Sequence, residues 1–188
     1  SLVGSEMCIR DSPHDPRISL PDYGKKYLDG DVSVPDNFLP EHPFDNGELQ
    51  IRDEMVLPAP RTPEQLKHEL ALYYGMVSEV DVQIGRVLEA LDESGNRENT
   101  IIVFASDNGL AMGQNGLIGK QSLYDHSVGV PMLIIDPRKP QQGRKTDALC
   151  YLYDLYPTLC ELVGIEIPSS VTCLLYTSPS PRDYAASR

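Results

Sequence analysis

The chain has 188 residues, of which 40% are hydrophobic and 23% charged, with a net charge of −12. A chain of this length can bury one core, so it holds at most one domain and part of another. The acidic charge argues against nucleic acid and anionic membrane surfaces as partners, and no apolar run approaches the roughly 18–20 residues of a membrane span.

The two ends of the chain are related to each other at the level of DNA. Residues 173–183, CLLYTSPSPRD, back-translate to a sequence whose reverse complement encodes residues 2–11, LVGSEMCIRD, in another frame. Neither folding nor selection on the protein produces such a relation, and the codons resemble the adapter of transposase-based sequencing libraries. We therefore expect residues 1–12 and 173–188 to be adapter-derived and exclude them from the fold, which leaves residues 13–172.

The first part of that stretch predicts loop and then a long helix. Residues 13–60 are rich in proline, aspartate and glycine and predict an irregular segment. A helix should begin after Thr62, which forms a capping box with Gln65. Apolar residues then alternate spacings of four and three between residues 66 and 91, so the helix should pack along its length on a sheet until Ser94 ends it.

The remaining elements predict an α/β fold with a parallel sheet. Residues 100–105, TIIVFA, and 128–135, VGVPMLII, are apolar on both faces, as buried parallel strands are. Residues 148–153 predict a short third strand. A helix over residues 157–163, closed by Gly164, follows. Helices and strands in this order are typical of a sheet flanked by helices.

Asp107 and Asn108 follow the first predicted strand, and open α/β sheets bind ligands at such strand ends. Carboxylate and amide oxygens suit calcium or magnesium. The alternative is structural, because Asn108-Gly109 is a strong signal for a two-residue hairpin turn. On these residues alone, the turn is the favoured interpretation.

Lys120 ends a glycine-rich stretch that starts at Gly109. A phosphate-binding loop would need glycine at 114 and serine or threonine at 121, but the chain has Gln114 and Gln121, so that motif is absent. What remains is a lysine in the same region as Asp107, suited to an anionic group. The alternative is an ordinary surface lysine.

Other polar residues are weaker candidates. One interpretation is that His126 contacts and positions Lys120 without touching the substrate itself, but a purely structural histidine is the commoner case. We expect His42 and His68 to be solvated. One further alternative is that the acidic and basic side chains of residues 52–54 face a substrate.

These motifs, in this order, resemble the second half of the catalytic domain of the sulfatase family. The matching stretches are TIIVFASDNG (100–109), GQNG (113–116), GKQSLYDHS (119–127), VGVPMLII (128–135) and DLYPTL (154–159), preceded by PHDPR (13–17) and two helical segments (73–76 and 81–86). The resemblance covers nearly all of residues 13–172. It implies the α/β fold of alkaline-phosphatase-like enzymes, with a mostly parallel sheet flanked by helices and the N-terminal half missing.

The resemblance also implies a reaction, in which a formylglycine attacks the sulfur of a sulfate ester and a calcium ion polarises the sulfate oxygens. It makes Asp107 and Asn108 two of the calcium ligands and Lys120 a sulfate-binding residue. His14 would contact the bridging oxygen and protonate the leaving alcohol. The implied substrate is a sulfated small molecule or carbohydrate, and the implied location is periplasmic or secreted.

The family's nucleophile motif, Cys or Ser-x-Pro-x-Arg, does not occur in the chain, nor does the early aspartate pair that completes the calcium site. We therefore expect residues 13–172 to be the C-terminal part of a sulfatase catalytic domain that is inactive by itself and binds calcium weakly or not at all. Two alternatives stay open: a phosphate or phosphonate ester hydrolase of the same superfamily, and a non-catalytic half-domain.

Overall fold

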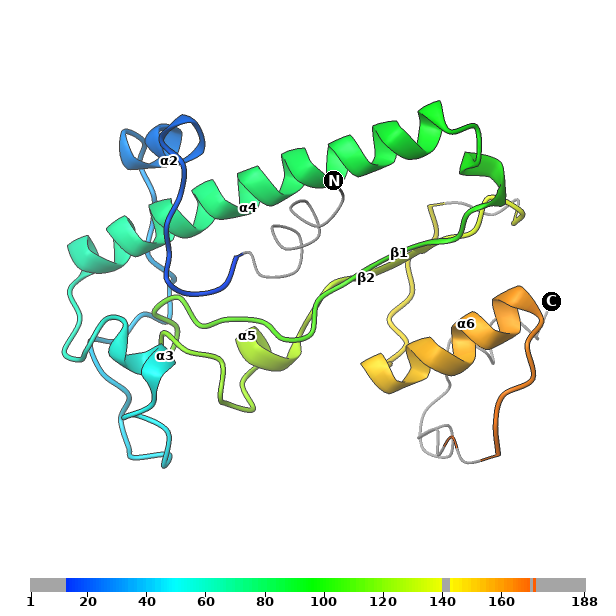
Figure 1. Cartoon of the computed structure of the whole chain (residues 1–188). Helices are drawn as coiled ribbons and strands as arrows, with labels where there is room; N and C mark the ends of the chain where they lie inside the picture. The colour runs from blue at the N-terminus through cyan, green and yellow to red at the C-terminus, as the bar shows by residue number, and fades with distance from the viewer. Residues whose placement is uncertain (1–12, 140–142, 170, 172–188) are drawn as a thin grey trace. The chain divides into compact units, whose positions relative to one another are not determined.

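The computed structural model describes residues 13–139, 143–169 and 171, and divides into two compact units, residues 1–138 and 139–188 (Figure 1). The segments that we expect to be adapter-derived, residues 1–12 and 173–188, lie outside the described residues, so that expectation stays a prediction.

The first unit contains four α-helices, a 3-10 turn and two strands among its described residues. In chain order they are α2 (Pro21–Leu28), α3 (Arg52–Met55), α4 (Pro63–Glu93), η1 (Arg97–Asn99), β1 (Ile102–Ala105), α5 (Asp125–Val128) and β2 (Met132–Ile135). Helices α2 and α3 lie in the stretch that we expected to be irregular throughout, so that expectation is wrong in part. Both are short, eight and four residues, and neither has a side-chain N-cap that would reveal it in the sequence.

Helix α4 begins as predicted. The Thr62 hydroxyl accepts a hydrogen bond from the Gln65 backbone N–H at 3.3 Å, and the Gln65 side chain accepts one from the Thr62 N–H at 2.9 Å. Ser94 is the C-cap, also as predicted. Of the apolar stripe, Leu66 and Leu70 are buried, whereas Val77 and Val87 are 42% and 49% exposed. The other stripe residues of the second half, Val80, Ile84 and Leu91, are only half-buried. The prediction that the helix packs along its whole length is therefore wrong for the described residues.

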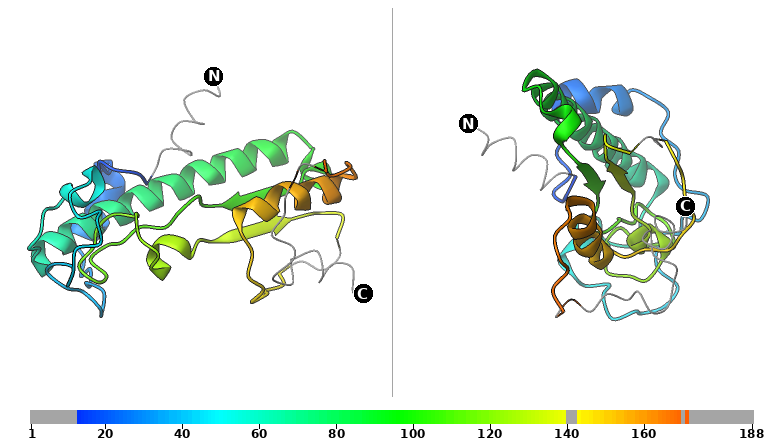
Figure 2. Two further views of the ribbon diagram at one scale, coloured as in Figure 1. Left: turned by 90° about the horizontal axis from the view of Figure 1, so that it is seen from below. Right: turned by 90° about the vertical axis from the view of Figure 1, so that its right-hand side faces the viewer.

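Helix α2 packs against the first half of α4 (Figures 1 and 2). The helices meet at two glycines: a Cβ added at Gly75 would lie 2.8 Å from the Cα of Gly24. Nearby, the hydroxyl groups of Tyr27 and Ser78 are 2.8 Å apart. This contact fixes the chain that leads from His14 into α2 against the helix.

The two strands pair antiparallel, from Ile102 opposite Ile135 to Ala105 opposite Met132. The expected parallel pairing is therefore wrong for the strands described. A parallel pair needs a long crossover, usually a helix, whereas the stretch between β1 and β2 has only the four-residue α5 and folds back on itself. Apolar residues on both faces reveal burial but carry no information on strand direction.

The second unit contains η2 (Leu152–Asp154) and α6 (Leu155–Val163). The predicted third strand over residues 148–153 is wrong, since no strand is assigned to residues 148–151 and residues 152–153 belong to η2. The predicted helix is confirmed with its left-handed C-cap at Gly164, whose φ is 75°. Pro157 lies in the first turn of that helix, where the missing N–H costs no hydrogen bond.

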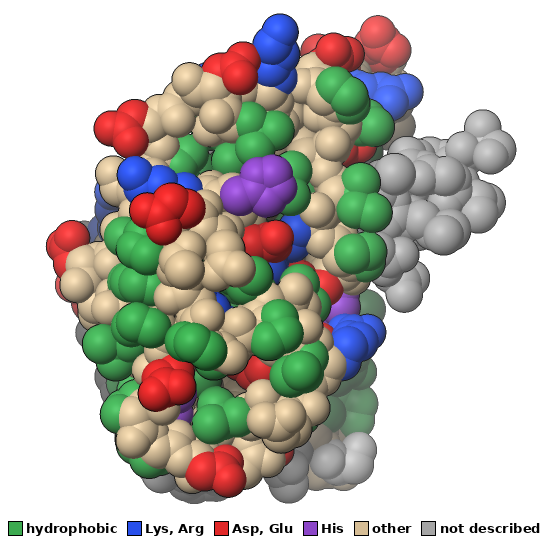
Figure 3. All heavy atoms as spheres, turned by 90° about the vertical axis from the view of Figure 1, so that its left-hand side faces the viewer, with side chains coloured by type: hydrophobic (Ala, Val, Ile, Leu, Met, Phe, Trp, Pro, Cys, Tyr) green, Lys and Arg blue, Asp and Glu red, His purple; other side chains and the backbone are tan. Residues whose placement is uncertain are grey.

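The core of the first unit joins the start of α4 to the loop that follows β1. Leu66 and Leu70 of α4 are buried together with Met112 and Ile118 of the loop. Partly buried apolar side chains of the same two segments and of residues 32–57 pack around them: Val32, Val34, Phe38, Leu57, Tyr73 and Leu110. The loop is therefore a packed part of the fold. The face that carries α3 mixes acidic, basic and apolar side chains (Figure 3). No helix among the described residues is long and apolar enough to cross a membrane.

Candidate active site

The structure brings Lys120 and His14 together. The Lys120 ammonium lies 2.7 Å from Nε2 of His14, although the two residues are 106 positions apart. The Nδ1 atom of His14 lies 2.9 Å from the backbone carbonyl of Asp15. Because a carbonyl can only accept, Nδ1 carries the hydrogen and Nε2 presents its lone pair to the ammonium. A cation and a proton-carrying imidazole thus meet at one partly open place.

Asp53 lies behind this pair and is 2% exposed. Its Oδ2 is 3.8 Å from the Lys120 ammonium and accepts a hydrogen bond of 2.9 Å from the Gln121 side chain. Arg52 donates to Oδ1 at 2.7 Å. Burial raises the pKa of Asp53, but hydrogen bonds from Gln121 and Arg52 and the charges of Lys120 and Arg52 outweigh burial, so the pKa lies below its usual value. The carboxylate stays charged and balances the lysine.

The loop that carries Lys120 is held by a buried ion pair. Glu54 accepts hydrogen bonds from the backbone N–H groups of Ile118 and Gly119, the latter at 2.8 Å. Arg61 pairs with Glu54 at 2.8 Å and donates to the carbonyl of Gly116. Removing one member of such a pair leaves an uncompensated buried charge, so the path of the loop before Lys120 is strongly determined.

Asp107 and Asn108 lie at the end of β1, beside the Lys120 loop. The Gly109 N–H donates to the Ser127 carbonyl at 2.8 Å, and the Ala111 N–H donates to the Gly119 carbonyl at 2.8 Å. A Cβ at Gly109 would lie 2.0 Å from the His126 carbonyl oxygen, so only glycine allows this approach. The hairpin turn predicted at Asn108-Gly109 is therefore wrong, since neither residue has the positive φ that such a turn needs. Positive φ values of 54° and 74° occur at another Asn-Gly pair, Asn115-Gly116.

The oxygens of Asp107 and Asn108 fit part of a cation site. The Asn108 amide nitrogen donates to the Gly109 carbonyl at 2.8 Å, which leaves the amide oxygen as the end available to a metal. Asp107 is exposed, and its Oδ1 accepts from the Asn108 N–H at 2.8 Å. Across residues 13–139, 143–169 and 171, no group of three or more acidic, histidine or cysteine side chains could hold a metal ion. These two residues would supply part of a ligand set.

His126 is half-buried, and its Nε2 lies 3.2 Å from the Ser122 hydroxyl, which in turn is 2.8 Å from the Ser127 hydroxyl. Burial lowers the pKa of His126 below its usual value, against the opposing charges of Glu54 and Asp125. No contact of His126 with Lys120 or His14 is found among the described residues. This geometry supports the structural role for His126.

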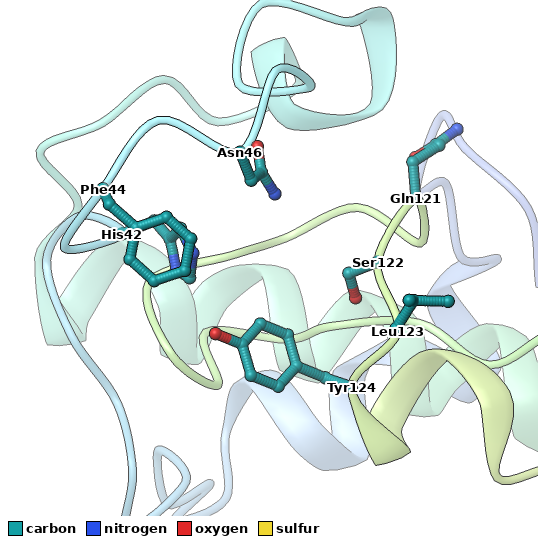
Figure 4. Close-up of a pocket in the computed structure, with 7 residues that line it drawn as sticks. All are labelled: His42, Phe44, Asn46, Gln121, Ser122, Leu123 and Tyr124. Carbon is teal, nitrogen blue, oxygen red and sulfur yellow. The ribbon is translucent and has the colours of Figure 1, made fainter.

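His42 and a neighbouring cavity were missed in the sequence. His42 is 7% exposed, so the expectation that it is solvated is wrong, whereas His68 is exposed as expected. Its Nδ1 donates to the Asn115 carbonyl at 2.7 Å. A cavity of about 430 Å³ opens beside it, lined by His42, Phe44, Asn46, Gln121, Ser122, Leu123 and Tyr124 (Figure 4). The cavity forms between residues 42–46 and residues 121–124, and the tertiary contacts that bring these two segments together have no local sequence pattern.

The chain matches the family model described as Sulfatase over residues 10–165. It is 42% identical over 109 residues to an arylsulfatase of Clostridium perfringens, covering 56% of this chain and 23% of that protein. It is 34% identical over 99 residues to an N-acetylglucosamine-6-O-sulfatase of Bacteroides thetaiotaomicron, covering 53% of this chain and 18% of that protein.

The fold is also similar to a solved phosphonate monoester hydrolase of Agrobacterium radiobacter. The TM-score of this comparison is 0.68, with 28% sequence identity, and the match covers 82% of this chain and 34% of that one. The chain therefore spans about a third of this structure and less than a quarter of the two sulfatases above. Because the family model matches most of its length, the chain belongs to the sulfatase family.

Proposed function

We propose that this chain is part of an enzyme that hydrolyses sulfate esters, and that Lys120 and His14 receive the sulfate group. The observation that carries the proposal is the 2.7 Å contact between the Lys120 ammonium and Nε2 of His14. A cation suits a sulfate oxygen, and an imidazole is the side chain best suited to move a proton near neutral pH.

Lys120 and His14 would have different roles at the sulfate ester. Lys120 would donate to a sulfate oxygen and offset its negative charge, while the Asp53 carboxylate, 3.8 Å from the ammonium, would help to hold it in place. His14 would lie at the bridging oxygen, where the leaving alcohol needs a proton. Because Nε2 carries a lone pair in this tautomer, His14 would first take up a proton there from the Lys120 ammonium, 2.7 Å away, and then pass it to the alcohol.

Calcium and the formylglycine nucleophile belong to the same proposal. Asp107 and Asn108 would hold part of the calcium site, with further ligands from outside this chain. When bound, calcium supplies positive charge to the sulfate oxygens, and the formylglycine supplies the attacking oxygen. The chain has no Cys or Ser-x-Pro-x-Arg motif, so we propose that residues 13–172 alone turn over no sulfate ester.

The substrate that we propose is a sulfated small molecule or carbohydrate. The similarity to an N-acetylglucosamine-6-O-sulfatase supports a sugar ester. A periplasmic or secreted location remains a proposal from family analogy.

A phosphate or phosphonate ester hydrolase is the second candidate, because the fold is similar to a phosphonate monoester hydrolase. The two functions differ in the anion that the site prefers. Titration of the purified chain with inorganic sulfate and inorganic phosphate at pH 7 separates them: tighter binding of sulfate is expected, and a clear preference for phosphate would favour the second candidate.

The source DNA upstream of codon 13 provides a separate test. A continuous reading frame with paired aspartates followed by Cys or Ser-x-Pro-x-Arg would complete the proposed site. A frame without that motif would contradict the sulfatase reaction and leave a non-catalytic half-domain.

A further inference from the structure

The cavity between residues 42–46 and 121–124 has well-fixed walls (Figure 4). The first wall is anchored by the hydrogen bond of 2.7 Å between His42 and the Asn115 carbonyl. A Cβ at Gly116 would lie 2.2 Å from the Glu41 carbonyl carbon, so this glycine allows the wall to approach the loop. The second wall is anchored by the Ser122 hydroxyl, 2.8 Å from that of Ser127.

The cavity adjoins the proposed sulfate-binding pair. Gln121 lines the cavity, and its side chain donates to Oδ2 of Asp53 at 2.9 Å. The same oxygen lies 3.8 Å from the Lys120 ammonium. One buried carboxylate oxygen thus contacts both the cavity wall and the cation. A sulfate held by Lys120 would have the cavity beside it for the organic part of its ester.

The lining combines aromatic faces with polar groups. The Phe44 side chain is 59% exposed and its ring lies 4.4 Å from that of His42, while Tyr124 stands edge-on to His42 at 5.8 Å. Asn46 and Ser122 add hydrogen-bonding groups to the lining. Aromatic faces next to amide and hydroxyl groups suit a ring that has an apolar face and hydroxyl groups at its edge.

His42 supplies an additional polar atom. Its Nδ1 donates to the Asn115 carbonyl, so Nε2 is an acceptor, and this buried atom has no hydrogen-bond partner among the residues that the structure describes. A buried acceptor without a partner is costly. A ligand hydroxyl group that reached Nε2 would satisfy it.

We propose that this cavity binds the sugar ring of a sulfated carbohydrate whose sulfate lies on Lys120. The proposal rests on the proposed function, since it takes the sulfate position from the Lys120–His14 pair. Phe44 and Tyr124 would contact the face of the ring, and Asn46 and Ser122 its hydroxyl groups.

The test compares three probes on the purified chain by calorimetric titration: inorganic sulfate, D-glucose 6-sulfate and 4-nitrophenyl sulfate. Glucose 6-sulfate is expected to bind more tightly than inorganic sulfate. Phe44→Ala should weaken glucose 6-sulfate binding about three- to tenfold, the value of one aromatic contact, and leave inorganic sulfate unchanged. Phe104→Ala, a matched change of a half-exposed phenylalanine on β1, should change neither. Phe44→Leu replaces Phe44→Ala if thermal melting shows that the latter unfolds.

The outcomes separate this inference from the proposed function. Equal affinities for glucose 6-sulfate and inorganic sulfate, or a Phe44 variant that binds the sugar ester as the parent does, would overturn the cavity assignment alone. Tighter binding of 4-nitrophenyl sulfate only would overturn the sugar ring as its ligand. Failure of all three probes to bind would instead overturn the sulfate-binding role of Lys120, and this inference with it.

Discussion

Nζ of Lys120 and Nε2 of His14 lie 2.7 Å apart because a third residue ties their segments together. Arg17, three positions after His14, is 5% exposed and donates to the Ile118 carbonyl at 3.1 Å. The same guanidinium bonds Glu69 of α4 at 3.0 Å. The histidine segment, the lysine loop and the long helix therefore share one buried arginine.

Replacing Asp53 with asparagine should destabilise the fold by about 1–3 kcal/mol at pH 7, because the buried groups around it lose a charged partner. The folded pKa of Asp53 lies below the unfolded value. Its contribution is therefore fully present above the ordinary aspartate pKa of about 3.9 and is lost as the pH falls through the folded value. Urea unfolding of the parent and of Asp53→Asn should show that the difference between their free energies of unfolding becomes smaller at acidic pH.

Asp31→Asn is the matched control for that change, since the Asp31 side chain is 93% exposed and its ion pair with Lys67 is long, at 3.9 Å. Its effect should stay within about 0.5 kcal/mol. A D53N protein as stable as D31N at pH 7 would contradict the role assigned to Asp53.

Two glycine-to-alanine changes should have opposite signs. At Gly109 the new Cβ would lie 2.0 Å from the His126 carbonyl, and the overpacking should cost about 1–3 kcal/mol or more. At Gly85, within α4, a Cβ meets nothing within 4 Å, and alanine should stabilise the helix by about 0.5–1 kcal/mol. Thermal melting measures both, and a neutral Gly109→Ala would show that the segment after β1 does not approach α5 as described.

His126 should make stability depend on pH near neutrality. Burial lowers the folded pKa of His126, so the unfolded chain binds the proton more readily. The stabilisation is fully present above the unfolded pKa of about 6.5 and is lost as the pH falls through the folded value. The free energy of unfolding, measured with urea, should fall more between pH 7.5 and pH 5.5 for the parent than for His126→Gln. Equal differences would mean that His126 titrates as in the unfolded chain.

The sequence predicted the elements with strong local signals and missed those fixed at long range. The Thr62–Gln65 capping box and the Gly164 C-cap each act within a few residues, and both are confirmed. The direction of β2 depends on how the loop after β1 folds back, and no local pattern records that.

The candidate site divides in the same way. Lys120 was a candidate from its place after the glycine-rich stretch, and His14 only from the family resemblance; their contact is a structural finding. Asp53 was only one of three adjacent candidates, because its burial depends on Gln121 and Lys120, which lie more than sixty positions away. The role of His42 depends on Asn115 in the same manner.

Calcium should bind to this chain weakly. Asp107 and Asn108 offer two side-chain ligands, whereas calcium takes six to eight oxygens. Titration with calcium chloride should therefore give a dissociation constant weaker than about 1 mM. Micromolar affinity, lost in Asp107→Asn, would show that the chain supplies a full set of ligands.

The central claim is that Lys120 binds sulfate, and titration of the purified chain with sodium sulfate tests it most directly. Lys120→Ala should weaken the binding about tenfold or more, because a charged hydrogen bond to the anion is worth about 1.5–3 kcal/mol. Lys67→Ala, which removes a half-exposed lysine of α4, should leave it unchanged. Sulfate binding that survives Lys120→Ala, or falls equally in both variants, would contradict the account.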